Sequence, residues 1–305
     1  MNLVDFLPYF CFILAGYSVI ANDSIQTLGT WISSNQKHVK WYWMALAASS
    51  ILIITIVYSW YTNTGDISYH RLDRIPFQTI KWYHVIAPIV LVILTRMGVP
   101  VSTSFLILTT FASQVVFEKM LVKSVVGYMS AAMVAYAVWL LMSRVLDENK
   151  SVSEPKKPYW RIAQWFTTGF LWWTWLAHDM ANVAVFLPRQ LSSYDLSFVL
   201  FFLVSTLFYI FYVGGGKIQN VVLTKKNTRY VRSATLIDLV YALILLFFKE
   251  LNDIPMSTTW VFLGLLAGRE LAIYQRNGDN NKKSIFPIIR DDFGKLVLGL
   301  IASIA

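Results

Sequence analysis

Long apolar runs separated by short polar connections occupy most of the 305-residue chain. A membrane-spanning helix needs about 20 consecutive, mostly apolar residues, so the runs predict about ten crossings, about five in each half of the chain. A short or broken run can also re-enter the membrane instead of crossing it. We therefore expect an all-α membrane protein with broken or re-entrant helices. The runs cover residues 3–33, 41–60, 82–95, 105–117, 122–142, 162–187, 196–213, 234–248, 260–274 and 285–305.

One charged segment with two prolines, residues 143–161, separates these runs into two groups. It holds Asp147, Glu148 and Glu154 together with Lys156 and Lys157, a composition typical of a solvated connection. We expect it to be a cytoplasmic linker between a first half, residues 1–142, and a second half, residues 162–305.

The overall composition agrees with a membrane protein. The chain is 56% hydrophobic and only 14% charged, whereas a soluble domain carries about 25% charged residues. Disorder is excluded as well, because it requires low hydrophobicity. The single cysteine, Cys11, allows no intrachain disulfide and no cysteine metal site. The N-terminus lacks the basic region and cleavage site of a removable signal peptide, so we expect the first apolar run to remain in the protein.

The net charge of +9 comes from basic residues in the connections, such as Lys225 and Lys226, and not from a basic stripe on a helix. We therefore expect no nucleic-acid partner. With ten crossings, and with Lys123, Arg269 and Arg290 of the runs counted with the adjoining connection, the odd-numbered connections carry 18 of the 26 Lys and Arg residues and the even-numbered ones carry 7. Because basic connections stay in the cytoplasm, this predicts cytoplasmic odd connections, both termini outside, and a plasma or inner membrane.

Two motifs occur twice. Residues 21–26 (Ala-Asn-Asp-Ser-Ile-Gln) match residues 177–182 (Ala-His-Asp-Met-Ala-Asn), and residues 100–104 (Pro-Val-Ser-Thr-Ser) match residues 255–259 (Pro-Met-Ser-Thr-Thr). The aspartates are 156 positions apart and the first serines 155, so one duplication explains both motifs. An odd number of crossings per half makes the repeats inverted, an architecture that places transporter sites at interrupted helices near the bilayer midplane.

Asp23 and Asp179 lie inside long apolar runs. An ionised carboxylate at membrane depth costs about 2.5–3.5 kcal/mol on insertion scales, so it needs a cation, a proton or a cluster of donors. We therefore interpret Asp23 and Asp179 as functional residues by default. The alternative is a helix cap near the interface, which suits Asp23 alone better than both copies.

The second motif places hydroxyl side chains after a proline, which starts or breaks a helix. Unpaired N–H groups and a positive dipole at such a helix start bind anions. A single copy is more often an ordinary N-cap, but the matched pair favours an oxyanion site. The hydroxyls are those of Ser102, Thr103, Ser104, Ser257, Thr258 and Thr259.

Amides and hydroxyls flank both aspartates, and their oxygens are hard ligands that suit Na⁺. His178 either carries a proton or hydrogen-bonds its neighbours. No zinc cluster, nucleotide-binding loop or hydrolase elbow is present, so we expect neither an enzyme nor an ATPase. We expect no cofactor beyond a coupling ion, Na⁺ or H⁺. The candidate ion ligands are Asn22, Asp23, Gln26, Thr27, His178, Asp179 and Asn182.

These motifs resemble those of the inorganic phosphate transporter (PiT) family, whose inverted halves each carry Gly-Ala-Asn-Asp-Val-Ala-Asn-Ala and Pro-Ile/Val-Ser-Thr-Thr-His. Residues 28–30 (Leu-Gly-Thr) also look like the family's Phe-Gly-Thr. The chain departs from the pattern at Gln26, at His178, and at Phe105 and Trp260, which replace the family's histidine. The resemblance implies that the six hydroxyls hold phosphate and that the aspartates and amides bind it together with Na⁺.

We therefore expect a secondary active transporter that carries inorganic phosphate through the lipid bilayer together with Na⁺ or H⁺. Phosphate retains a proton near neutral pH and can donate it to a carboxylate, whereas bare sulfate would be repelled by two carboxylates. Sulfate or another small oxyanion is the alternative substrate. A non-transporting membrane scaffold or sensor is the alternative from another class. The sequence does not decide whether the protein forms a homo-oligomer.

Overall fold

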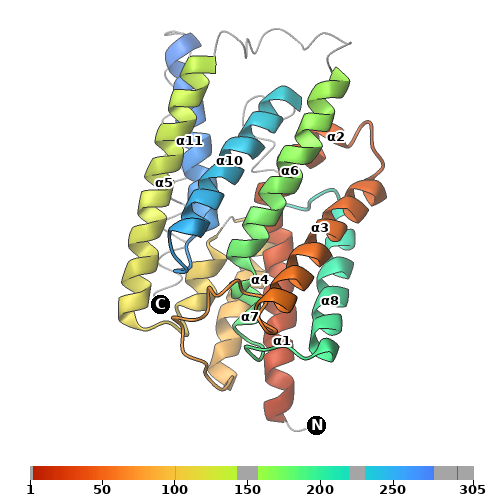
Figure 1. The fold of residues 1–305 in the computed structure, drawn as a ribbon, viewed down its shortest axis with the longest axis vertical. Helices are drawn as coiled ribbons and strands as arrows, with labels where there is room; N and C mark the ends of the chain where they lie inside the picture. The colour runs from red at the N-terminus through yellow and green to blue at the C-terminus, as the bar shows by residue number, and fades with distance from the viewer. Residues whose placement is uncertain (1–2, 100, 143–156, 220–230, 278–293, 295–305) are drawn as a thin grey trace.

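The computed structural model describes residues 3–99, 101–142, 157–219, 231–277 and 294, and this part of the chain is helical, without a strand. Wide π-helical or short 3-10 turns interrupt several α-helices. Figure 1 shows the helices packed as an elongated bundle. The elements are α1 (Leu3–Ser18), η1 (Val19–Asp23), α2 (Ser24–Asn35), α3 (Trp41–Thr62), η2 (Trp82–Val85), α4 (Ile86–Met97), η3 (Ser104–Leu108), α5 (Gln114–Met142), α6 (Lys157–Asp179), α7 (Ala181–Ala184), α8 (Ser193–Tyr212), α10 (Val231–Leu251) and α11 (Thr258–Asn277).

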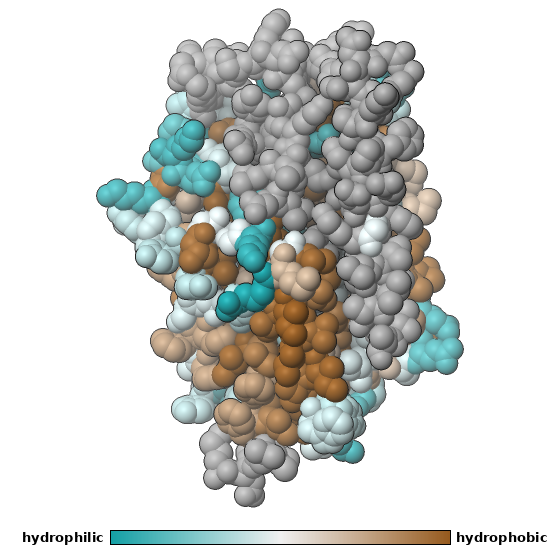
Figure 2. Space-filling view, turned by 180° about the vertical axis from the view of Figure 1, so that it is seen from behind, coloured by the Kyte–Doolittle hydropathy of each residue, from teal (hydrophilic) through white to brown (hydrophobic). Residues whose placement is uncertain are grey.

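Within the described residues, five helical segments are long and apolar enough to cross a membrane: Phe6–Asn35, Trp41–Thr62, Gln114–Met142, Ser193–Tyr212 and Val231–Leu251. Large apolar side chains also cover their outer surfaces, including Ile54, Leu141 and Phe201, each more than 60% exposed. Figure 2 shows apolar residues gathered over the lower half of one face, with polar residues toward its edges. Such a surface is soluble in lipid and not in water, so the chain is an integral membrane protein.

The first half contains a short helical hairpin, which we call hairpin 1 (residues 86–108). Its first arm, α4, has 12 residues and is about 18 Å long, too short to cross the roughly 30 Å hydrocarbon core. α4 ends at Gly98, whose left-handed φ of 80° turns the chain. The return arm is η3, and α5 then begins at Gln114. The apolar run 105–117 is therefore not one helix, and hairpin 1 is re-entrant.

The second half contains a matching hairpin 2 (residues 231–277), in which α10 and α11 pack against each other. In Figure 1 both helices extend toward one end of the molecule from a connection near mid-height, whereas α4 extends toward the opposite end. A re-entrant hairpin begins and ends on the same side of the membrane. It therefore does not change the side predicted for the connections before and after it. The count of ten crossings stays a prediction, since run 285–305 and most of linker 143–161 fall outside the described residues.

Two glycines let α11 lie directly on α5. A Cβ atom at Gly264 would be 2.3 Å from the carbonyl oxygen of Tyr128, and one at Gly268 would be 2.0 Å from that of Ala132. Small residues of this kind allow close helix contact where apolar side chains gain nothing by leaving lipid. The contact fixes the position of α11, whose first residues belong to the second hydroxyl motif.

Candidate substrate and ion site

The two aspartates of the duplicated motif, Asp23 and Asp179, both lie where a membrane helix is interrupted. The π-helical turn η1 ends at Asp23, directly before α2. The second copy breaks differently: α6 ends at Asp179, and the short α7 begins at Ala181. Both carboxylates have 0% exposure. Interruptions of this type free backbone groups from the helical pattern and occur frequently at functional sites.

The two hydroxyl motifs share one local geometry. The Ser102 hydroxyl accepts a hydrogen bond from the Phe105 N–H at 3.2 Å, and the Ser257 hydroxyl accepts one from the Trp260 N–H at 3.3 Å. The first serine of each motif therefore caps its own helical turn, as the N-cap interpretation expected. Pro100, the first residue of the first motif, lies outside the described residues.

A chain of side-chain contacts connects the first motif to both aspartates. The Thr103 hydroxyl donates to Asp23 Oδ2. Asn182 Nδ2 donates to Thr103 Oγ1 at 2.9 Å and to Asp179 Oδ1 at 2.8 Å. Ser104 Oγ lies 3.4 Å from Asp179 Oδ1. Residues from both halves thus form one buried cluster, and the two carboxylates lie close enough to interact electrostatically.

The second motif contacts the first directly. Thr259 Oγ1 and Asn22 Nδ2 both donate to the carbonyl oxygen of Val101, each at 3.2 Å. The residues that follow the motifs, Phe105 and Trp260, pack with ring centroids 5.3 Å apart. The tips of hairpins 1 and 2 therefore meet inside the molecule.

The remaining hydroxyls of the second motif are also buried. Thr258 lies beside the Asp179 carboxyl, and its carbonyl oxygen accepts a hydrogen bond from the Tyr241 hydroxyl at 2.9 Å. The Ser257 N–H donates to Ser124 Oγ at 2.9 Å, which attaches this tip to α5. All six motif hydroxyls belong to residues with at most 5% exposure.

Four buried oxygens of this cluster have no hydrogen-bond partner: Asn22 Oδ1, Gln26 Oε1, Asp179 Oδ2 and Asn182 Oδ1. Buried polar atoms are nearly always paired, so orphaned atoms of one kind in one place need an explanation. Since all four are acceptors, they suit a hard cation, whose ligands are carboxylate and amide oxygens. This ligand set fits the expected Na⁺.

Three predicted ion ligands make other contacts. Gln26 Nε2 lies 3.2 Å from Asp23 Oδ1, so its amide holds the carboxylate. Thr27 Oγ1 donates to the Ser24 carbonyl of its own helix at 2.7 Å. His178 Nε2 lies 2.8 Å from the Leu245 carbonyl, while its Nδ1 has no partner. The structure therefore brings Gln26 to the cluster, and attaches Thr27 and His178 to backbone oxygens.

Two buried cations beside hairpin 2 were not singled out by the sequence. Arg71 Nη1 donates to the Asn252 carbonyl at 2.8 Å, and Lys123 Nζ donates to the Asn252 and Ile254 carbonyls at 3.0 and 2.8 Å. Together they hold the connection that precedes the second motif. Burial lowers the pKa of Arg71 to about 10, an effect that the carboxylate of Asp253 opposes most strongly. Because 10 is still well above neutral, the guanidinium stays charged.

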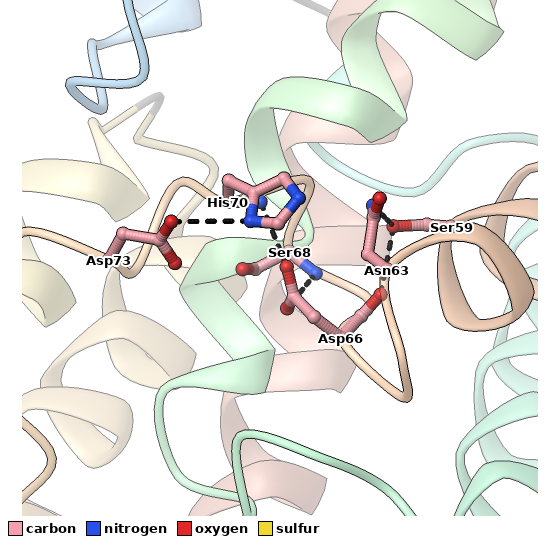
Figure 3. A network of polar contacts seen from close by, with 6 residues as sticks. All are labelled: Ser59, Asn63, Asp66, Ser68, His70 and Asp73. Atoms are coloured by element: carbon pink, nitrogen blue, oxygen red, sulfur yellow. Dashed lines mark hydrogen bonds and ion pairs between the residues drawn. The ribbon is translucent and has the colours of Figure 1, made fainter.

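A network of polar contacts holds the turn that contains Arg71, and Figure 3 shows its members Ser59, Asn63, Asp66, Ser68, His70 and Asp73. Asp66 Oδ1 accepts from the Ser68 N–H at 2.7 Å, and Asp66 Oδ2 accepts from the His70 N–H at 2.8 Å. His70 Nδ1 pairs with Asp73 at 3.2 Å. The network supports left-handed backbone at His70, with φ of 61°, which polar side chains tolerate best.

The fold and the buried cluster define an integral membrane protein in which two hairpins, one from each half, present hydroxyl tips to paired aspartates. Among solved structures, one described as the sodium-dependent phosphate transporter is similar to the chain, with a TM-score of 0.68. The similarity covers 99% of this chain and 97% of that one, at 16% sequence identity, and shows a shared fold. No family model matches the chain. A search of curated proteins also finds no match.

Proposed function

We propose that the protein is a secondary active transporter that carries inorganic phosphate together with a cation, Na⁺ or H⁺. The observation that carries the proposal is the convergence of Asp23, Asp179 and both hydroxyl tips in one fully buried cluster. The overall fold of a sodium-dependent phosphate transporter supports the same conclusion.

The cation and the anion have separate ligands in this proposal. The orphaned oxygens of Asn22, Gln26, Asp179 and Asn182 hold the cation. The Ser102 and Ser257 hydroxyls only accept hydrogen bonds from the described residues, so their O–H groups can donate to the oxyanion. The other tip hydroxyls donate to it by turning from their present acceptors, helped by N–H groups at the helix starts. Tyr241 steadies the second tip through its bond to the Thr258 carbonyl.

Electrostatics supplies the coupling. Two neighbouring carboxylates in a low-dielectric site repel an anion, so phosphate binds tightly only after a cation neutralises part of their charge. The cation gradient then drives phosphate accumulation. An O–H of phosphate can also donate to a carboxylate, which favours phosphate over sulfate.

Alternating access follows from the position of the cluster between the tips of two oppositely directed hairpins. The contacts of Thr259 and Asn22 with the Val101 carbonyl join these tips. Opening to either side requires one hairpin to move relative to the other around the bound ions. With connections 1, 5, 7 and 9 in the cytoplasm, hairpin 1 faces outward and hairpin 2 inward. Connection 3 is then the buried tip of hairpin 1 and not a cytoplasmic loop.

The test is uptake of radiolabelled phosphate into proteoliposomes containing the purified protein. We expect uptake driven by an inward Na⁺ or proton gradient, abolished when the gradient is dissipated by an ionophore and only weakly inhibited by excess sulfate. Strong inhibition by sulfate would assign another oxyanion. Absence of uptake, together with no thermal stabilisation by phosphate plus Na⁺, would contradict transport and favour a scaffold or sensor.

A further inference from the structure

A third buried carboxylate lies outside the proposed substrate site. Asp238, on α10, has 0% exposure. Its Oδ1 accepts a hydrogen bond from the Thr30 hydroxyl at 2.6 Å, and its Oδ2 accepts one from the Thr168 hydroxyl at 2.5 Å. The three residues come from α10, α2 and α6, which pack together at this level. None of them belongs to the duplicated motifs.

Asp238 forms no salt bridge with any described residue. Arg269 on the adjacent α11 pairs with Glu270 at 2.9 Å and donates to Ser233 Oγ at 3.2 Å. Lys123 on α5 is directed to the Asn252 and Ile254 carbonyls. The other charged or titratable groups described on α10 and on the helices packed against it, together with Asp23 directly before α2, are Arg232, Tyr241, Lys249, Glu250, Glu118, Lys119, Tyr128, Tyr136, Tyr159, Arg161, His178, Asp179 and Tyr274.

The nearest acidic groups of the proposed site lie along the same helices. Asp23 precedes Thr30 by seven positions, about 10 Å along a helix, and Asp179 follows Thr168 by eleven positions, about 16 Å. Asp238 thus forms a separate layer, about two to three helical turns from the two aspartates of the substrate cluster. An ionised carboxylate there would be buried at membrane depth without a contacting cation, which is costly.

A proton fits this layer better than a metal ion. The contacts supply four oxygens from three side chains, fewer than the six or more that hard cations commonly take, and both hydroxyls already lie within hydrogen-bond distance. A protonated carboxyl can instead donate to one threonine hydroxyl, which then donates to the carbonyl four residues earlier. Thr55 and Thr206 make that backbone bond elsewhere in the chain, to Ile51 and Phe202.

Polar side chains continue from Asp238 toward the end of α2. Gln164 Nε2 donates to Ser34 Oγ at 2.8 Å, and Asn35 Nδ2 donates to Gln164 Oε1 at 2.9 Å. Ser34 lies one turn after Thr30, and Gln164 one turn before Thr168. The next residue, Gln36, is exposed. This polar group therefore lies one helical turn from the Asp238 layer, between it and the surface that carries residues 36–40.

We propose that Asp238, held by Thr30 and Thr168, is a proton-binding site distinct from the substrate site, and that it exchanges its proton with the residue 36–40 side through Gln164 and Ser34. In this proposal Asp238 is protonated and donates to one of the two threonine hydroxyls at the observed oxygen–oxygen distances. Its use in transport rests on the proposed function, whereas its protonation does not.

Infrared spectroscopy of the purified protein tests protonation directly. We expect a protonated-carboxyl band at neutral pH that disappears in Asp238→Asn and shifts in Thr30→Val and Thr168→Val, because each valine removes one hydrogen bond to the carboxyl. Asp195→Asn, at the half-exposed start of α8, is the matched control and leaves this band in place. A wild-type spectrum without a band that Asp238→Asn removes contradicts the proposal.

Transport supplies the second readout. In proteoliposomes, Asp238→Asn is expected to retain phosphate uptake driven by Na⁺ while flattening its dependence on pH, since asparagine mimics a permanently protonated carboxyl. An unchanged pH profile in this variant contradicts a role in proton exchange. If the wild-type protein carries no phosphate, the proposed function fails, and the infrared result still decides whether Asp238 binds a proton.

Discussion

Asn182 Nδ2 donates a hydrogen bond to Thr103 Oγ1 at 2.9 Å, although the two residues are 79 positions apart and belong to different halves of the chain. The same amide nitrogen also contacts Asp179 Oδ1, and the same hydroxyl contacts Asp23 Oδ2. One amide and one hydroxyl therefore join the two aspartates into a single unit. The proposed coupling of cation and anion binding depends on this unit.

Replacing either aspartate by asparagine tests the unit most directly. Asp23→Asn and Asp179→Asn keep the size of the side chain but remove the charge that attracts the cation. We expect each variant to lose coupled phosphate uptake, by about 100-fold or more, while expression and thermal stability stay near wild type. This loss corresponds to roughly 3 kcal/mol, within the range for removing one partner of a buried charged contact.

Asp73→Asn is the control for this experiment, because Asp73 is an exposed carboxylate that contacts only His70 in the turn network. It should transport normally. Wild-type-like uptake by both Asp23→Asn and Asp179→Asn would falsify the assignment of these residues to the transport site.

The hydrogen bond between Asn182 and Thr103 predicts non-additive effects on ion binding. Thr103→Val and Asn182→Ala should each raise the Na⁺ concentration needed for half-maximal uptake, or for half-maximal thermal stabilisation. The double variant should be less impaired than the sum of the two, with a coupling energy of about 0.5–3 kcal/mol, as for residues in direct contact. Strict additivity in this double-mutant cycle would show that the two side chains act independently.

The sequence located the aspartates and hydroxyl tips because an acidic residue in an apolar run, repeated at one spacing, is a strong signal. Asp238 also lies in an apolar run, 234–248, but it has no counterpart at the repeat spacing, so the duplication does not mark it. The Gly-Val-Pro sequence at residues 98–100 marks the break between the two runs of hairpin 1. Hydropathy does not separate a crossing helix from a re-entrant one, so the sequence left open whether these runs cross the membrane.

The contacts of Arg71 were beyond sequence reasoning for a different reason. They join a connection between α3 and η2 to carbonyl groups 178 to 183 positions later. A backbone carbonyl has no residue-specific signature, so its distant partner cannot be read from the sequence. The basic residue was visible, but it counted only toward the charge of its connection.

The contact between α11 and α5 predicts a strong dependence on small residues. Gly268→Ala would place a methyl group where only 2.0 Å separates it from the Ala132 carbonyl oxygen, so the helices must move apart. We expect a loss of about 1–3 kcal/mol in stability, as for other overpacked interiors, seen as a lower melting temperature in detergent. Gly169→Ala is the control, since its nearest neighbour is the flexible end of Ile51 at 3.2 Å. Equal melting temperatures for the two variants would argue against the close contact.

Arg71 should control the position of the second tip although it lies outside the buried cluster around Asp23 and Asp179. Its guanidinium bonds to the carbonyls of Asn252, Ile254 and Lys249, at 2.8, 3.4 and 3.3 Å. Removing it leaves buried acceptors unpaired, which costs about 1–3 kcal/mol, and frees the connection that leads to Ser257. We expect Arg71→Ala to raise the phosphate concentration for half-maximal uptake several-fold and to lower the melting temperature.

Arg71→Lys should recover only part of this loss, because a single ammonium cannot reproduce the planar fork of the guanidinium. Arg74→Ala is the matched control, since Arg74 is exposed on the same connection. With a pKa of about 10, Arg71 remains charged throughout the neutral range, so the defect of Arg71→Ala should be the same at mildly acidic and mildly alkaline pH. A defect that appears only on one side of neutrality would mean that another group, and not the lost guanidinium, sets the position of the tip.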